Sequence, residues 1–99
     1  MQSDDTPRTI LKLPKVLDLN AAGRLHEQVL AHRGADIDID ASDVGRVGAQ
    51  CIQVLLSAAI SWRAENLCFR VGKASAAFVK TLEILGISDE ALRPKEMVK

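Results

Sequence analysis

Residues 35–41, ADIDIDA, constrain the fold of this chain more than any other stretch. Ile37 and Ile39 alternate with aspartates, and since successive side chains of a strand point to opposite faces, the pattern predicts a strand with one buried face. The aspartates then share the other face. No glycine or distal glutamate completes a calcium loop of the EF-hand type, so we interpret them as solvated or paired with cations and predict no metal site.

Strand and helix patterns alternate along the rest of the chain. The predicted strands lie at 8–13, 15–17, 35–41 and 67–71, and the predicted helices at about 20–33, 49–64 and 76–85. Asp18 or Asn20 can cap the first helix, and Ser75 the third, because a short side-chain oxygen accepts a hydrogen bond from an early backbone N–H. Residues 72–74 are predicted to form a turn.

This order of elements predicts the fold class. Strands that alternate with helices imply parallel pairs joined by crossovers. We therefore predict a two-layer α/β domain. It should contain about four strands in a mixed sheet, with three or four helices packed on that sheet.

The helix predicted over 49–64 is the longest element. Its apolar residues cover more than one stripe, so it should be largely buried, or covered on one side by a partner. The first turn of a helix carries unpaired N–H groups and the positive end of the dipole, and the small side chains of Gly48 and Ala49 leave these donors open to a partner. The alternative is that Ser42, Asp43 or water satisfies them.

Three polar side chains beside this helix start are candidates for a protein contact. Arg46 stands between Val44 and Val47, so it points outward if both valines point inward, and its planar fork pairs well with carboxylates. Gln50 and Gln53 offer neutral hydrogen bonds at the first turns of the helix. The alternative is that all three are ordinary exposed side chains.

The charge balance excludes several classes of partner. The 99 residues contain 13 Lys or Arg and 13 Asp or Glu, and this zero net charge removes the electrostatic case for binding nucleic acid or an anionic membrane. Only 3% of the residues are aromatic, so single-stranded nucleic acid would find no set of stacking platforms.

Motifs for catalysis, cofactors and metals are missing from the sequence. Neither a GxxxxGK[ST] nor a GxGxxG motif occurs, so we predict a non-enzymatic protein without a cofactor. Cys51 and Cys68 belong to no CxxC pair, which argues against zinc. Cys51 lies at a helix start, where a thiol can become reactive, but its position in the apolar stripe favours the core.

The ends of the chain carry no targeting signal. The first residues, MQSDDTP, are acidic and polar, which is the opposite of a signal peptide. The apolar run over 51–62 is too short to span a bilayer. We therefore expect a cytoplasmic protein without membrane insertion, a single domain over 1–99, and loose tails at 1–7 and 89–99.

The order of motifs resembles a known family. The strand that ends in Asp40-Ala41-Ser42, the short loop and the long helix of residues 36–62 are similar to the STAS domain, the sulphate-transporter and anti-sigma-factor-antagonist domain. Leu17-Asp18 matches the Leu-Asp that precedes the first helix of that family. Residues 75–87, which end in Leu-Gly-Ile, resemble its closing helix. The resemblance covers about residues 8–88 and implies a single STAS-like domain.

The chain departs from this family at one functional position. Phosphorylatable STAS domains read Asp-Ser-Ser-Gly-Leu at the start of the long helix, and a partner kinase phosphorylates the first serine. Here the aligned residues are Gly48-Ala49-Gln50-Cys51-Ile52, so Ala49 replaces the acceptor serine. A methyl group has no oxygen to phosphorylate, so we predict a degenerate phosphosite at Ala49.

Within the family, the helix entry looks most like the small single-domain STAS proteins of bacterial chemotaxis systems. The resemblance then implies docking on a signalling kinase, a chemotaxis histidine kinase or a kinase-like regulator. Two alternatives stay open: the STAS subunit of a phospholipid-transport ABC system, and an unphosphorylated anti-sigma-factor antagonist. The predicted partner-binding residues are Ser42, Asp43, Arg46, Gly48, Ala49, Gln50 and Gln53.

Overall fold

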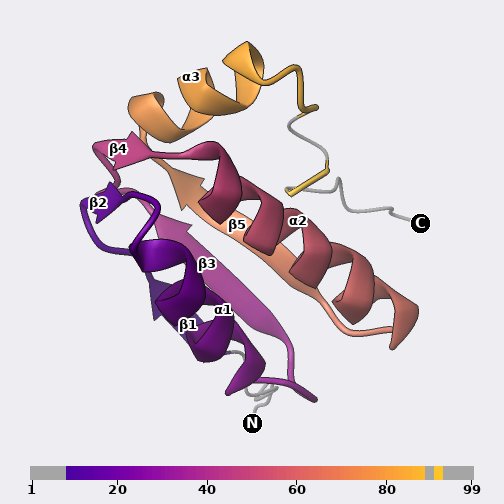
Figure 1. Cartoon of the computed structure of the whole chain (residues 1–99). Coiled ribbons are helices and arrows are strands. Elements are labelled where there is room, and N and C mark those ends of the chain that lie inside the picture. The colour runs from indigo at the N-terminus through magenta and orange to yellow at the C-terminus, as the bar shows by residue number, and fades with distance from the viewer. Residues whose placement is uncertain (1–8, 89–90, 93–99) are drawn as a thin grey trace, which may run out of the picture.

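The computed structural model describes residues 9–88 and 91–92 (Figure 1). Within these residues the chain forms strands and helices in the order expected from the sequence, with one additional short strand. The elements are β1 (Thr9–Lys12), β2 (Val16–Leu17), α1 (Ala21–Leu30), β3 (Ile37–Ala41), β4 (Arg46–Val47), α2 (Ala49–Ala64), β5 (Phe69–Ala74) and α3 (Ala76–Ile84).

The strands are arranged in two sheets. In the larger sheet β3 lies between β1 and β5, and the smaller sheet pairs β2 with β4. Each of these pairs is parallel, because a helix or a long connection carries the chain back between paired strands. The two-layer α/β fold is confirmed. The expectation of one mixed sheet of about four strands is corrected: the five described strands form two sheets, and all of their pairs are parallel.

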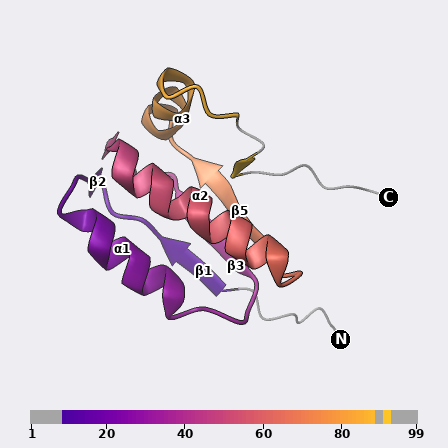
Figure 2. The ribbon, with the colours of Figure 1, turned by 45° about the vertical axis from the view of Figure 1, so that its right-hand side comes forward.

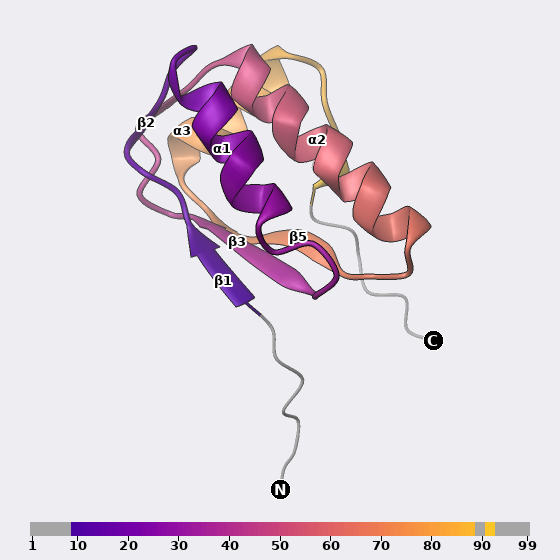
Figure 3. The same cartoon turned by 60° about the horizontal axis from the view of Figure 1, so that its bottom comes forward.

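The helices cover one face of the larger sheet. Figure 3 shows α1 and α2 on the same side of β1, β3 and β5. Figure 2 shows them side by side, with α3 on the far side of α2 from α1. The α3 helix packs against β4, so it stands near the end of the sheet where α2 begins. The opposite face of the larger sheet carries the aspartates of β3.

The core lies between the sheet and its helices. Ile37 and Ile39 are fully buried, whereas Asp38 and Asp40 are only partly buried, which confirms a strand with one buried face. Trp62 on α2 packs edge to face on Phe69, and its indole N–H donates to Ala35 O at 2.8 Å. The other buried side chains include Leu13, Leu17, Leu25, Val29, Val44, Cys51, Ile52, Leu55, Val71, Phe78 and Leu82.

The helix ends follow the predicted caps. Asp18 caps α1, since its Oδ1 accepts a hydrogen bond from Ala21 N at 3.2 Å, while Asn20 makes no side-chain cap. Ser75 caps α3 by accepting from Phe78 N at 3.1 Å. Its hydroxyl donates to Val44 O at 2.6 Å, which ties the start of α3 to the loop before α2.

The turn predicted at residues 72–74 is wrong, because β5 continues through it with a bulge. The register against β3 shifts after Ile39, so that Ile39 pairs with Val71 and Asp40 with Lys73. Asp38 supports this bulge: its Oδ1 accepts a hydrogen bond from Gly72 N at 3.1 Å. A side chain at Gly72 would collide with the Asp38 carboxylate, so glycine suits this place.

The chain segment after α3 returns to the sheet. Leu92 is fully buried, and its carbonyl oxygen accepts a hydrogen bond from Val71 N at 2.9 Å. The expectation of a loose tail over 89–99 therefore does not hold at Leu92, whose side chain completes the core beside β5. The rest of that expected tail, apart from Ala91, and the expected tail at 1–7 lie outside the described residues.

Candidate partner-binding surface

The α2 helix begins at an exposed and uncapped tip. Gly48 is its N-cap residue in extended conformation and offers no side-chain cap, and the first turn contains no acidic residue. Gly48 N itself donates to Leu17 O at 2.9 Å, which fixes this tip against β2. Ala49, the first residue of the helix, is exposed. The methyl group of Ala49, where the resemblance to phosphorylatable STAS domains predicts a missing serine, therefore lies at an accessible helix terminus.

Arg46 lies next to this tip, in a strand instead of the expected loop. It belongs to β4, and its N–H donates to Lys15 O at 3.1 Å. Val44 is buried and Val47 is partly buried, so the Arg46 side chain points to solvent as predicted. The pairing with β2 was missed because two-residue strands leave almost no periodic pattern.

Ser42 and Asp43 take part in contacts with the sheet. The Ser42 hydroxyl donates to Asp40 Oδ1 at 2.6 Å, and its backbone N–H donates to the same oxygen at 2.9 Å. These bonds, with the side-chain bond first, lower the pKa of the Asp40 carboxyl. Asp43 forms an ion pair with Lys12 at 3.2 Å. Neither residue makes a side-chain cap for α2. Their predicted role in partner binding stays a prediction.

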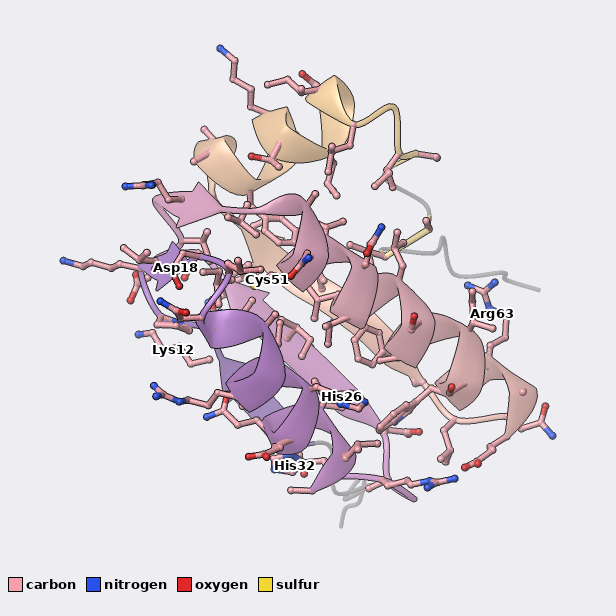
Figure 4. The ribbon with its side chains drawn as sticks, viewed as in Figure 1. Lys12, Asp18, His26, His32, Cys51 and Arg63 are labelled. Carbon is pink, nitrogen blue, oxygen red and sulfur yellow. The ribbon has the colours of Figure 1, made fainter. Side chains whose placement is uncertain are left out.

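Gln50 and Gln53 are exposed on α2, where they line a shallow groove of about 410 Å³ between α1 and α2. His26 lines the same groove from α1, and Figure 4 shows it on the side of α1 that faces α2. The two glutamines therefore extend the surface from the tip of α2 towards α1.

Two residues that line the hollows of this surface, Leu19 and Thr81, were not predicted from the sequence. Leu19 lies in the loop before α1, and its side chain is 67% exposed. It lines one hollow of about 200 Å³ with Ala49 and Gln50, and a second of about 360 Å³ with Arg46 and Thr81 of α3. The available signal was an apolar residue directly after Leu17-Asp18 that the apolar stripe of α1 does not need.

Cys51 lies just behind this surface and is fully buried. Its thiol donates to Asp18 O at 3.4 Å, and Figure 4 shows the two residues close together. Burial raises the pKa of the Cys51 thiol, and the negative charge of Asp18 raises it further. The thiol stays protonated and inaccessible, which agrees with a place in the core.

The described part of the chain shows neither a cluster of metal ligands nor a membrane-spanning helix. Among residues 9–88 and 91–92, no group of three or more His, Cys, Asp or Glu side chains is close enough together to hold a metal ion. None of the helices in these ranges combines the length and apolar character needed to cross a bilayer.

A comparison with known protein families identifies the family of this chain. A family model described as "Mlab, STAS domain" matches residues 1–98. The chain belongs to the STAS domain family. STAS domains are generally non-enzymatic regulatory modules that bind protein partners. No curated protein and no solved structure matches the chain. The STAS domain expected from the motifs of residues 36–62 and 75–87 is thus confirmed, and the match covers almost the full length of the chain.

Proposed function

We propose that this STAS domain is a non-enzymatic docking module that binds a signalling histidine kinase, a chemotaxis kinase in the first place, in the cytoplasm. The contact is made by a corner surface at the start of α2. This corner surface consists of Leu19, Arg46, Gly48, Ala49, Gln50 and Gln53. The observation that carries the proposal is the exposed, uncapped tip of α2 with Ala49 at the family's phosphorylation position.

The chemistry of the corner surface favours binding over catalysis. It offers an exposed leucine, a cation, two amides and open backbone N–H groups, but these include no nucleophile or general base. The nearest thiol, Cys51, is buried and protonated. Such a mixture of an apolar centre with polar neighbours is typical of protein interfaces.

Docking at this corner is not switched by phosphorylation of the STAS domain. The Ala49 side chain has no oxygen that could accept a phosphoryl group. Regulation therefore comes from the amount of this protein or from the state of its partner.

A binding measurement with the chemotaxis kinase tests the surface. Arg46→Glu and Gln50→Glu should each weaken binding at least about tenfold, because each places a negative charge in the contact. Arg63→Glu is the matched control, since Arg63 is also exposed but lies at the opposite end of α2 (Figure 4). Unchanged binding by both corner variants rejects the proposed surface.

Incubation with the kinase and labelled ATP tests the absence of a switch. The wild-type chain should remain unlabelled under conditions in which the kinase labels itself. Label on any serine or threonine of this chain overturns the proposal of switch-free docking.

A second candidate function is that of the STAS subunit in a phospholipid-transport ABC system. The description "Mlab, STAS domain" of the matching family model is the observation that favours it. The same corner surface would then bind the ATPase subunit. Parallel binding measurements with the kinase and with that ATPase subunit separate the two functions.

A further inference from the structure

We infer that the partner holds the corner surface at two points: an apolar socket takes the Leu19 side chain, and a carboxylate beside the socket pairs with Arg46. The inference rests on the proposed function and names the chemistry of the partner's surface. It commits to a protein partner, the kinase, and not to a second copy of this chain.

The loop that carries Leu19 is held on both sides. Leu17 is buried, and its carbonyl oxygen accepts the hydrogen bond from Gly48 N. Asp18 is fixed by its side-chain bond to Ala21 N and by the contact of its carbonyl oxygen with the Cys51 thiol. The Leu19 side chain is nevertheless 67% exposed. An apolar side chain presented by an ordered loop loses little conformational freedom on binding, which suits an interface anchor.

Hollows on both sides of Leu19 let a partner surround it. One hollow, of about 200 Å³, is shared with Ala49 and Gln50, and the other, of about 360 Å³, with Arg46 and Thr81. A partner's socket has walls, and these walls need room next to the anchor. The two hollows supply that room, so Leu19 can enter a pocket instead of meeting a flat surface.

Arg46 supplies the charge that selects the partner. None of the described carboxylates forms an ion pair with it: Asp43 pairs with Lys12, and Asp38 pairs with Arg70. Since Arg46 and Leu19 line the same hollow, one partner element that crosses it touches both. A guanidinium pairs best with a planar carboxylate, so an Asp or Glu beside the apolar socket is the complementary feature.

Titration of the kinase with variants of the full chain, at several salt concentrations, tests both points. Leu19→Ala should weaken binding about tenfold without changing its dependence on salt. Arg46→Gln should weaken binding several-fold and flatten the dependence on salt, because the charge pair is lost. Ile60→Ala is the control: Ile60 is also 67% exposed but lines neither hollow, so binding should not change.

The outcomes distinguish this inference from the proposed function. Wild-type binding that Leu19→Ala leaves intact, or whose salt dependence survives in Arg46→Gln, overturns the two-point contact while the docking function stands. No wild-type binding to the kinase removes both. Self-association of the wild-type chain that Leu19→Ala abolishes makes a second copy the occupant, which also overturns the inference. All three variants change exposed side chains, and an unchanged Tm verifies that they fold.

Discussion

Two polar surfaces of this domain differ in whether their charged side chains have partners within the fold. On the outer face of the larger sheet, the acidic strand β3 lies between strands that carry cations, and the register aligns Lys12, Asp40 and Lys73 in one row. Asp38 accepts hydrogen bonds from Arg70 and Gly72, and Asp40 accepts them from Ser42. The corner surface instead leaves Arg46 without an ion pair among the described residues and α2 without a side-chain cap.

The difference separates charges that support the fold from charges that we propose bind a partner. Polar groups that bind one another fix the register of the strands and have little capacity left for a ligand. Polar groups without such partners add little to the stability of the fold but remain available for recognition. Substitutions on the outer sheet face should therefore change stability, and substitutions on the corner surface should change binding.

The largest effect on stability is expected for Gly72→Ala. The new Cβ would collide with the Asp38 carboxylate, which must leave its hydrogen bond with Gly72 N. The loss of this hydrogen bond to a charged group lowers the free energy of unfolding by about 1–3 kcal/mol. Urea unfolding measures the loss, and kinase binding by the folded fraction should stay unchanged.

Gly23→Ala is the matched control for this substitution. Gly23 lies in α1, and a Cβ added there meets no atom within 4 Å. Alanine favours a helix over glycine by up to about 1 kcal/mol, so the same change should here stabilise the protein. If Gly72→Ala is as stable as the wild type, the outer face is not the rigid structural surface that the comparison requires.

The second-largest effect is expected for Gln50→Glu, which should stabilise the fold but weaken binding to the kinase. A carboxylate in the first turn of a helix interacts favourably with the N-terminal dipole, and α2 has no acidic residue there. The free energy of unfolding should rise by about 0.3–1 kcal/mol. Binding to the kinase should nevertheless weaken. Thermal unfolding and titration calorimetry on one protein sample measure both.

A Gln50→Glu variant that loses both kinase binding and stability would contradict the comparison of the two surfaces. It would show that the tip of α2 is a structural element. Gln53→Glu, one turn further along the same exposed side, is the companion variant. Its effect on stability should be smaller because the dipole effect fades beyond the first turn.

The fold could be predicted where side-chain periodicity was strong. The alternation of Ile37 and Ile39 with aspartates gave β3 its buried face, and Ser75 marked the start of α3 correctly. Prediction failed where a short element depends on distant partners. The strand at Arg46 exists because β2 offers it a partner, and the bulge at Gly72 exists because Asp38 fills the space beside it.

The site was predictable in part for the same reason. Arg46 could be placed on the surface because Val44 and Val47 point inward on either side of it, and Ala49 could be placed through the resemblance to the helix start of the family. Thr81 could not, since α3 comes next to this surface by packing on β4, which is far from it in sequence. Ser42 was predicted as a contact residue, but its hydroxyl bonds to Asp40, a pairing that local sequence did not reveal.

The third effect, Gly48→Ser, is smaller. A serine at the N-cap can accept a hydrogen bond from the first turn of α2, and the position has room, since the nearest atom to an added Cβ is Leu17 O at 3.7 Å. Glycine is itself tolerated at an N-cap, so stability should rise by only about a few tenths of a kcal/mol. Thermal unfolding measures it, with Gly45→Ser as a control of similar space but no helix to cap. An equal gain in both variants would mean that α2 is not short of a cap.

The smallest effect concerns the titration of Asp40 in Ser42→Ala. The Ser42 hydroxyl is the main cause of the lowered pKa of Asp40, so the pKa in the variant should rise towards its ordinary value. A carboxyl with a lowered pKa stabilises the fold above its unfolded pKa and loses that contribution as the pH falls through its folded pKa. The stability difference between wild type and variant should therefore exist at neutral pH and disappear in acid.

Carbon-13 NMR of the Asp40 carboxyl follows this titration directly. Ser57→Ala is the control, because Ser57 lies on α2, on the other side of the sheet from the Asp40 side chain. Kinase binding by Ser42→Ala decides to which surface Ser42 belongs. Unchanged binding assigns Ser42 to the outer sheet face, where its hydroxyl supports Asp40. If Ser42→Ala binds the kinase more weakly while Asp40 titrates as in the wild type, the corner surface extends to residue 42. The boundary between the two surfaces would then disappear.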